Sequence, residues 1–210
     1  MWKTAVYLAL SVAAAESFGT MTIGGPEGPG GVQVTCDLPL ELRKVNIASR
    51  GLGCCVFRSL DHAARWQNVP ALYGMPEWMK SKGIEGGGYP AKVAKLVPQI
   101  AKDRGMPVPE LVTYTGKDPR FLEVLLSTGR MPCITYCGRD KHYNGQTIAH
   151  MVNLVYLDKD RACILDNNFI GEQELVWMSR GEFIERWVGK GGGWGEGLLA
   201  PAAPPVPHLP

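Results

Sequence analysis

The chain has 210 residues, of which 45% are hydrophobic and 20% are charged, a balance typical of one globular domain with an ordinary core. The formal net charge is +2, and the densest basic stretch is the short Arg139-Asp140-Lys141 segment. A nucleic-acid-binding face needs a concentrated basic patch, so nucleic acid is excluded as a partner. No run of residues is long and apolar enough to predict a stable membrane span in the mature chain.

The first fifteen residues have the pattern of a short secretory signal. Lys3 precedes an apolar or small stretch, residues 4–15, and Ala13-Ala14-Ala15 ahead of Glu16 fits an A-x-A cleavage site. The alternative is a buried first helix of the domain. We expect residues 1–15 to direct export and the protein to be secreted or periplasmic.

Two flanking segments have compositions that cannot supply a packed core. Residues 16–40 are rich in glycine and proline, and the closing segment 201–210 reads "PAAPPVPHLP". Both are expected to be extended or disordered. The folded domain is therefore predicted over residues 41–200.

The first half of this domain has helical patterns. The second predicted helix contains Pro98, where we expect a kink. The third opens with Asp118 as its cap and Pro119 at its first position, and Gly129 ends it. The predicted helices span residues 55–67, 91–104 and 118–129.

The second half changes to the pattern of strands. The segments "MPCITY", "IAHMVNLVYL" and "RACILD" have strand-like composition, and the polar turn 158–161 should join the last two as a hairpin. Ser179 and Glu182 form a capping box for a short helix, and a further strand is expected near residue 198. Helices followed by antiparallel strands predict an α+β fold.

The six cysteines are spread over a domain that is large enough to be stable without a disulfide scaffold. Cys133 and Cys137 should share one face of a strand, and Cys36 and Cys163 have no partner that the sequence can name. A C-x3-C segment followed by His142 matches no strong zinc template. These cysteines are interpreted as buried or disulfide-bonded, and no metal or cofactor is expected.

Cys55 lies where a loop that contains Gly51 and Gly53 ends and a predicted helix begins. Unpaired N–H groups and the helix dipole at a helix N-terminus favour a thiolate, which makes Cys55 a candidate nucleophile. One alternative is that Cys54 and Cys55 are simply small buried hydrophobic residues. Another is that they form a redox pair, which we rank last because a bridge between adjacent cysteines is strained.

Four histidines could act as the base. His62 is on the same helix as Cys55 but lies roughly 10 Å along the axis, beyond hydrogen-bond reach. His142 falls in a polar loop and His208 in the closing segment. His150 lies on an apolar strand, where a polar ring needs partners, and it is therefore the preferred base.

The strand after His150 ends in Asp166-Asn167-Asn168, which brings candidate orienting groups near the imidazole. If Leu157 pairs with Ala162 across the turn, His150 falls opposite residue 169. This register favours Asn167 or Asn168 over Asp166 unless the hairpin twists strongly. Register alone leaves the third residue open.

The segment "GCCVFRS" resembles the "GSCWAFS" segment of papain-like cysteine peptidases, with Cys55 at the position of the nucleophile. His150 is followed sixteen residues later by Asp166, which is similar to the family's spacing from histidine to asparagine. A strand that ends in Asp looks closest to the bacterial branch related to bacteriocin leader peptidases. The resemblance covers residues 46–168 at the level of motifs.

The resemblance implies a two-lobe fold in which a helical lobe carries Cys55, an antiparallel β lobe carries His150 and Asp166, and a cleft lies between them. It implies hydrolysis of an amide bond in a peptide or protein through an acyl-enzyme on Cys55. His150 would be the base and Asp166 its orienting partner, with Asn167 as the alternative. A transglutaminase-type acyl transferase and a non-catalytic papain-like binding or structural module remain alternative interpretations.

One position departs from the family pattern. Papain-like enzymes place a glutamine six residues before the nucleophile to bind the oxyanion, whereas this chain has Ser49 there, and its nearest preceding glutamine is Gln33. Asn46 or Ser49 could donate instead, together with the backbone N–H of Cys55. Loss of one such donor typically lowers the rate by ~10²–10³.

Glycine and aromatic residues provide weaker signals. The Gly86-Gly87-Gly88 loop would admit an extended peptide backbone and is a candidate cleft wall. The aromatic side chains are assigned to packing or loop geometry; they are Tyr136, Tyr143, Trp177 and Trp194.

Overall fold

The structure is a computed structural model that describes residues 36, 38–49, 52–169, 175–189 and 193–199. The predicted signal 1–15, the tail 201–210 and most of the flank 16–40 lie outside the described residues. Within that flank, Cys36 and Leu38 are fully buried. The packed core therefore begins ahead of residue 41, where the sequence placed the start of the domain.

The predicted helices are present, with small shifts at their ends. Helix α5 begins one residue later than predicted, with Pro119 at the N-cap position, and Asp118 accepts a hydrogen bond from the backbone N–H of Arg120 (3.0 Å). Ser179 accepts one from the backbone N–H of Glu182 (3.1 Å), as expected of a capping residue. Helix α3 was not predicted. The helices are α2 (Cys55–Trp66), α3 (Met75–Ser81), α4 (Pro90–Asp103), α5 (Arg120–Ser127) and α6 (Arg180–Val188), with 3₁₀ turns at Leu40–Leu42 and Pro70–Leu72.

Six strands form one antiparallel sheet in the order β3-β8-β4-β5-β6-β7, so the fold is α+β as predicted. The sequence predicted neither β3, which precedes α5, nor β7, which precedes α6. The strands are β3 (Leu111–Gly116), β4 (Cys133–Asp140), β5 (Gln146–Leu157), β6 (Arg161–Leu165), β7 (Leu175–Ser179) and β8 (Gly193–Leu198). Two short strands, β1 (Ala48–Ser49) and β2 (Leu52–Gly53), pair separately ahead of α2.

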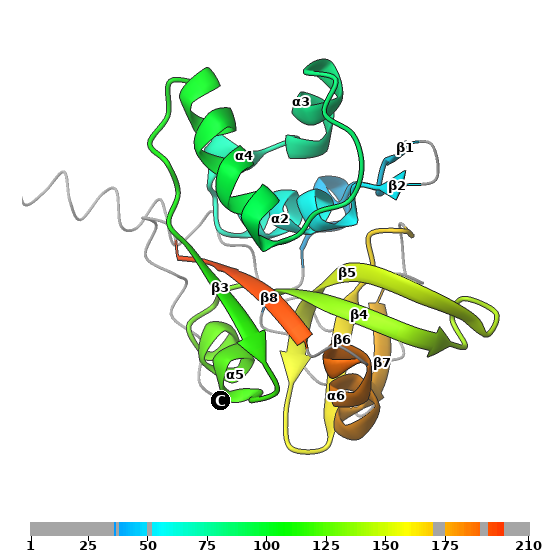
Figure 1. Ribbon diagram of the computed structural model, residues 1–210. Helices are drawn as coiled ribbons and strands as arrows, with labels where there is room; N and C mark the ends of the chain where they lie inside the picture. Colours follow the sequence, from blue (N-terminus) through cyan, green and yellow to red (C-terminus); the bar gives the residue numbers. More distant parts are fainter. Residues whose placement is uncertain (1–35, 37, 50–51, 170–174, 190–192, 200–210) are drawn as a thin grey trace, which may run out of the picture.

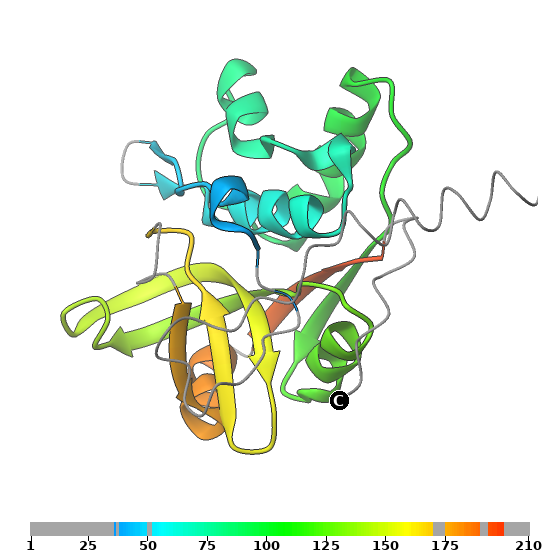
Figure 2. The same ribbon diagram turned by 180° about the vertical axis from the view of Figure 1, so that it is seen from behind.

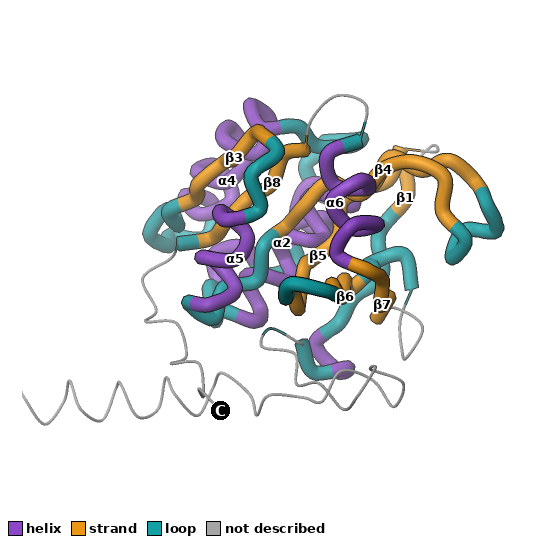
Figure 3. Tube along the Cα trace, turned by 90° about the horizontal axis from the view of Figure 1, so that it is seen from below, coloured by secondary structure: helices purple, strands orange, loops and turns teal. Residues whose placement is uncertain are grey.

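The helices divide between the two sides of the sheet. Helices α2, α3 and α4 gather on one side, with α2 nearest the strands, and α5 and α6 lie on the other (Figure 1, and from behind in Figure 2). From below, α5 and α6 lie in front of the strands (Figure 3). This arrangement covers β5 on both faces, which explains its unbroken buried run from His150 to Val155.

Helix α2 is buried along most of its length, including its charged residues. Arg58 pairs with Asp61 one turn away and also with Glu77 on α3. Asp61 further accepts hydrogen bonds from Arg65 (2.9 Å) and from the backbone N–H of Gly74 (2.7 Å). Because each buried charge has a partner, the helix can occupy the interior, and its charged side chains fix α3 and the residue just before it, Gly74.

The hairpin of β5 and β6 contains an irregularity that the sequence did not reveal. Leu157 pairs with Ala162, as predicted, but Asn153 pairs with Leu165, so β5 holds one extra residue between these two points. Opposed residues of an antiparallel pair share a face. Continuing the shifted register by one residue puts Asp166 opposite Val152, on the same face of the sheet as His150.

The cysteines of β4 are not joined to each other. Cys133 and Cys137 are free thiols, and Cys133 is buried, so of the two predicted alternatives, burial and a disulfide, the disulfide is absent here. Four residues along a strand separate two Cα atoms by about 13 Å, whereas a disulfide spans at most about 7 Å. Sharing a face is therefore insufficient for two cysteines of one strand to pair.

Glu196 on β8 is fully buried, and its two carboxylate oxygens each lie 2.9 Å from the hydroxyl of Thr113. Burial raises the pKa of this carboxyl from 4.5 to about 7, although the hydrogen bond from Thr113 offsets part of the effect. The folded protein therefore retains a proton that the unfolded chain releases between these two values.

Folding stability should fall as the pH rises through this window, because the native state then has to ionise a buried carboxyl. Glu196→Gln should remove up to about 3 kcal/mol of pH dependence between pH 4.5 and pH 8. Urea unfolding of both proteins at these pH values measures the difference. Equal pH dependence in the two proteins would contradict the assignment.

Candidate active site

A cleft of about 580 Å³ lies between the N-terminus of α2 and the sheet. Its walls come from the segment ahead of α2, the loop before α4, and strands β4, β5 and β8. The lining residues are Asn46, Gly53, Cys55, Val56, Gly87, Gly88, Thr135, Cys137, Ala149, His150, Met151, Asn168 and Trp194.

Cys55 is the first residue of α2 and is partly exposed in this cleft. Burial would raise the pKa of its thiol, but a hydrogen bond and the charge of His150, together with backbone N–H groups of Met151 and Val56, outweigh it and lower the pKa. These contacts favour the thiolate, and the two largest come from His150, ahead of the backbone N–H of Val56 at the helix N-terminus.

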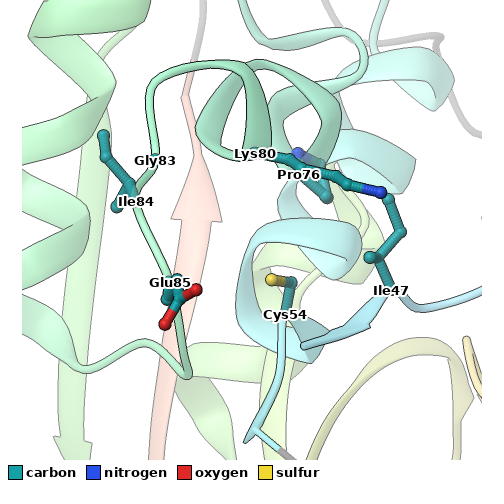
Figure 4. Close-up of a pocket in the computed structure, with 7 residues that line it drawn as sticks. All are labelled: Ile47, Cys54, Pro76, Lys80, Gly83, Ile84 and Glu85. Atoms are coloured by element: carbon teal, nitrogen blue, oxygen red, sulfur yellow. The ribbon is translucent and has the colours of Figure 1, made fainter. Parts of the chain in front are cut away.

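Cys54 lies in a different environment. It is buried and lines a separate pocket of about 200 Å³, where Figure 4 shows its sulfur turned toward the loop that carries Ile84 and Glu85. Burial raises the pKa of this thiol, and the charge of Lys92 offsets only part of the rise. Both Cys54 and Cys55 are free thiols, and only Cys55 faces the cleft.

His150 on β5 is only 7% exposed, and its ring is held on both sides. Nε2 lies 2.9 Å from Oδ1 of Asp166, which leaves Nδ1 as the nitrogen that meets the Cys55 thiol. Burial alone would lower the pKa of the imidazole, but Asp166 and Cys55 raise it to about 9. The imidazolium form is therefore stable beside the thiolate.

The other described histidines do not reach Cys55. His62 is buried within α2, and its Nε2 accepts a hydrogen bond from the backbone N–H of Lys44 (2.9 Å). Burial lowers the pKa of His62 to about 3, with further lowering by nearby arginines. His142 lies in the β4–β5 connection, where its ring packs edge-on against the ring of Phe169, with centroids 4.4 Å apart.

Asp166 is fully buried and its carboxylate is saturated with donors. Oδ1 accepts from His150 and from the backbone N–H of Asn168 (2.9 Å), and Oδ2 accepts from the hydroxyl of Tyr143 (2.5 Å). Burial would raise the pKa of this carboxyl, but the hydrogen bonds and the charge of His150 lower it. The structure thus brings Cys55, His150 and Asp166 together.

Asn167, the alternative orienting residue, points to the helix instead. Its Nδ2 donates to Oγ of Ser59 (3.0 Å) and to the backbone oxygens of Met151 (2.9 Å) and Cys55 (3.4 Å). Without the extra residue in β5, the register would have placed Asn167 on the face of the sheet that carries His150. The extra residue shifts the pairing by one, so Asp166 lies on that face and Asn167 on the other.

Of the two candidate oxyanion donors, Asn46 lies in the cleft. Its Nδ2 donates to Oδ1 of Asn168 (3.0 Å), and its backbone N–H donates to the carbonyl of Asn167 (2.5 Å). A Cβ at Gly53 would approach Nδ2 of Asn46 to 2.8 Å, so this glycine makes room for the amide. Ser49 ends β1, and its side chain lies outside the described part of the structure.

The predicted glycine wall is present at Gly87 and Gly88, which line the cleft opposite the sheet. A Cβ at Gly88 would lie 2.6 Å from Val56, so only glycine fits there. Lys92 on α4 ties the loop down because its ammonium donates to the carbonyls of Glu85 (2.7 Å), Gly86 (3.3 Å) and Gly87 (3.0 Å).

Several residues of the site were missed in the sequence. Tyr143 and Trp194 were assigned to packing, yet Tyr143 contacts Asp166 and Trp194 lines the cleft. The sequence also did not predict that Asn168 contacts Tyr143, or that Lys92 binds the carbonyl groups of the glycine loop. The only local signal was the density of polar and aromatic residues in "KHYNG", whose partners lie far away in the chain.

The comparisons with known proteins add no family or relative. No family model matches the chain, and no curated protein matches it. The described residues contain no group of three or more His, Cys, Asp or Glu side chains that could hold a metal ion. No helix in the described part of the chain is long and apolar enough to cross a membrane.

The pH dependence of alkylation tests this geometry. Iodoacetamide should label Cys55 at pH 7 at least about tenfold faster than the other cysteines, since an ordinary thiol is only a few per cent thiolate there. His150→Ala should raise the apparent pKa of Cys55, because it removes the hydrogen bond and the charge that lower it. Peptide mapping by mass spectrometry gives the rate at each cysteine.

Cys54→Ser is the matched control and should leave the profile of Cys55 almost unchanged. Labelling of Cys55 with the pH dependence of an ordinary thiol, or a profile indifferent to His150→Ala, would refute the ion pair.

Proposed function

We propose that this protein is a papain-like cysteine hydrolase that cleaves amide or peptide bonds through an acyl-enzyme on Cys55. One observation carries the proposal: a thiol of lowered pKa at a helix N-terminus contacts an imidazole that a buried carboxylate holds on its other side. The layered arrangement supports the papain-like assignment, since the helical side contributes Cys55 and the sheet contributes His150.

The chemistry follows from these contacts. The Cys55 thiolate attacks the amide carbonyl and forms a tetrahedral oxyanion, and the His150 imidazolium then gives its proton to the leaving amine. Water, activated by the neutral imidazole, hydrolyses the resulting thioester and restores the thiol. Asp166 keeps the ring oriented and stabilises its positive charge throughout.

The developing oxyanion needs donors that are already in place. The backbone N–H of Cys55, at an unpaired helix N-terminus, supplies one. We assign the second to the amide of Asn46, because this side chain lines the same cleft and is held by Asn168. Asn46 would thus donate to the oxyanion in place of the family's glutamine, although it lies at a different position in the chain.

The cleft walls favour a substrate in an extended conformation. Gly87 and Gly88 have no side chains, so a peptide backbone can approach them closely. On the opposite wall, the side chains of Thr135 and Ala149 are small, and Trp194 supplies one large apolar surface. The described lining carries no Asp, Glu, Lys or Arg, which favours recognition through the peptide backbone over recognition through charge.

Hydrolysis of a positional library of peptide amides tests the function. The wild-type protein should cleave with a bell-shaped pH profile, whose alkaline limb near pH 9 reports loss of the His150 proton. Cys55→Ser and His150→Ala should abolish cleavage, and Asp166→Asn should lower kcat by ~10²–10⁴ because the ring loses its partner. Cys54→Ser is the control and should remain active.

A mass spectrum of the quenched reaction should show the acyl group on Cys55. Absence of cleavage across the library, combined with ordinary reactivity of Cys55, would refute the proposal and support the non-catalytic alternative.

The role of Asn46 can be separated from that of the triad. Asn46→Ala should lower kcat for amide hydrolysis by ~10²–10³, because one oxyanion donor is lost. Alkylation of Cys55 by iodoacetamide forms no oxyanion, so its rate should change far less than kcat. Ser49→Ala is the matched comparison, and a larger loss there than in Asn46→Ala would assign the donor to Ser49 instead.

A further inference from the structure

The orienting carboxylate of Asp166 belongs to a longer chain of hydrogen bonds. Its Oδ2 accepts from the hydroxyl of Tyr143 at 2.5 Å, and this hydroxyl accepts from Nδ2 of Asn168 at 2.9 Å. Oδ1 of Asn168 in turn accepts from Nδ2 of Asn46 at 3.0 Å. The chain therefore runs from one wall of the cleft, behind Asp166, to the imidazole of His150.

The hydrogen bonds on both sides of this chain point toward Asp166: Asn46, Asn168 and Tyr143 donate along one side, and His150 donates from the other. Burial and the neighbouring Asp166 charge raise the pKa of Tyr143, so its hydroxyl keeps its proton and stays a donor. The Tyr143 ring packs edge-on against His150, with centroids 6.2 Å apart, and against Phe169 at 5.5 Å. Its position is thus fixed by packing as well as by hydrogen bonds.

We propose that Tyr143 and Asn168 are positioning residues that join the Asp166–His150 pair to Asn46, so that the base and the oxyanion donor are set as one unit. This inference rests on the proposed function. Tyr143 fixes the rotation of the Asp166 carboxylate, and Asn168 fixes the amide of Asn46 at the other end. Neither residue touches the reacting atoms.

Tyr143 also moderates the basicity of Asp166. A hydroxyl that donates to a carboxylate withdraws part of its negative charge, so the carboxylate stabilises the imidazolium less strongly. The other titratable groups around this pair are Cys55 on α2, and Asp140 and His142 around the start of the β4–β5 connection. The variants below leave all of these in place.

Tyr143→Phe keeps the ring and removes only the hydroxyl. We expect kcat to fall about tenfold or more, the effect of losing a hydrogen bond to a charged group, while KM changes little. The alkaline limb of the pH profile should move upward, because Asp166 then holds the imidazolium more strongly. The alkylation profile of Cys55 should move to lower pH for the same reason.

Tyr156→Phe is the matched control. Tyr156 lies on the same strand as His150, and its hydroxyl donates to Asp158 at 2.7 Å, far from the cleft. This variant should shift neither pH profile. A lower melting temperature in Tyr143→Phe, with both profiles and kcat unchanged, would mean a purely structural role and would overturn the proposal.

Asn168 is exposed, so its replacement does not threaten the core. Asn168→Ala should lower kcat about fivefold in the wild-type background and have no further effect in Asn46→Ala, the non-additivity expected of residues in one network. Additive losses would separate Asn168 from Asn46. If the wild-type protein hydrolyses no amide, the proposed function fails, and the alkylation profiles still decide whether Tyr143 acts on His150.

Discussion

The site depends on a buried seam of hydrogen bonds that joins α2 to β5. Ser59 donates to the carbonyl of Met151 (3.1 Å), Asn153 donates to the carbonyl of Ser59 (3.0 Å), and Asn167 donates to both Ser59 and Met151. Apolar contacts alone would allow the helix to slide along the strand. Sliding would also separate the buried polar groups from their hydrogen-bond partners, which destabilises the folded state. Cys55 begins the turn that contains Ser59, and His150 precedes Met151, so this seam sets their separation.

Given that separation, the charges of the three groups support one another. Burial disfavours the ionised form of each group taken alone. The imidazolium of His150 lies between two anions, however, and each contact lowers the free energy of both charges. The thiolate of Cys55 is therefore favoured while His150 is protonated, and the pKa of His150 is raised by its contacts with Asp166 and Cys55. The state with a Cys55 thiolate and a His150 imidazolium therefore depends on Cys55, His150 and Asp166 together.

The sequence predicted the helices except α3, most strands of the sheet, and Cys55 and His150 as candidates for nucleophile and base, because periodicity, capping residues and the cost of a buried polar ring are local signals. It left Asp166 and Asn167 open, since a one-residue irregularity in β5 decides which side chain faces His150. Such an irregularity depends on packing from other elements and leaves no composition signal. Tyr143 and Asn46 lie in irregular segments, so their contacts with residues 166–168 followed from no periodic pattern.

Lys92 acts on the wall of the cleft that the glycine loop forms. It lies near Cys54, just ahead of α2, and its charge offsets part of the rise in the pKa of that thiol. Its three hydrogen bonds to the carbonyls of residues 85–87 hold it on the glycine loop, and its ammonium also lies 5.5 Å from the centre of the Phe57 ring. The same contacts stiffen the wall that an extended substrate would meet. One cation thus shapes the cleft from outside its described lining, while that lining contains the Cys55–His150 pair and no Asp, Glu, Lys or Arg.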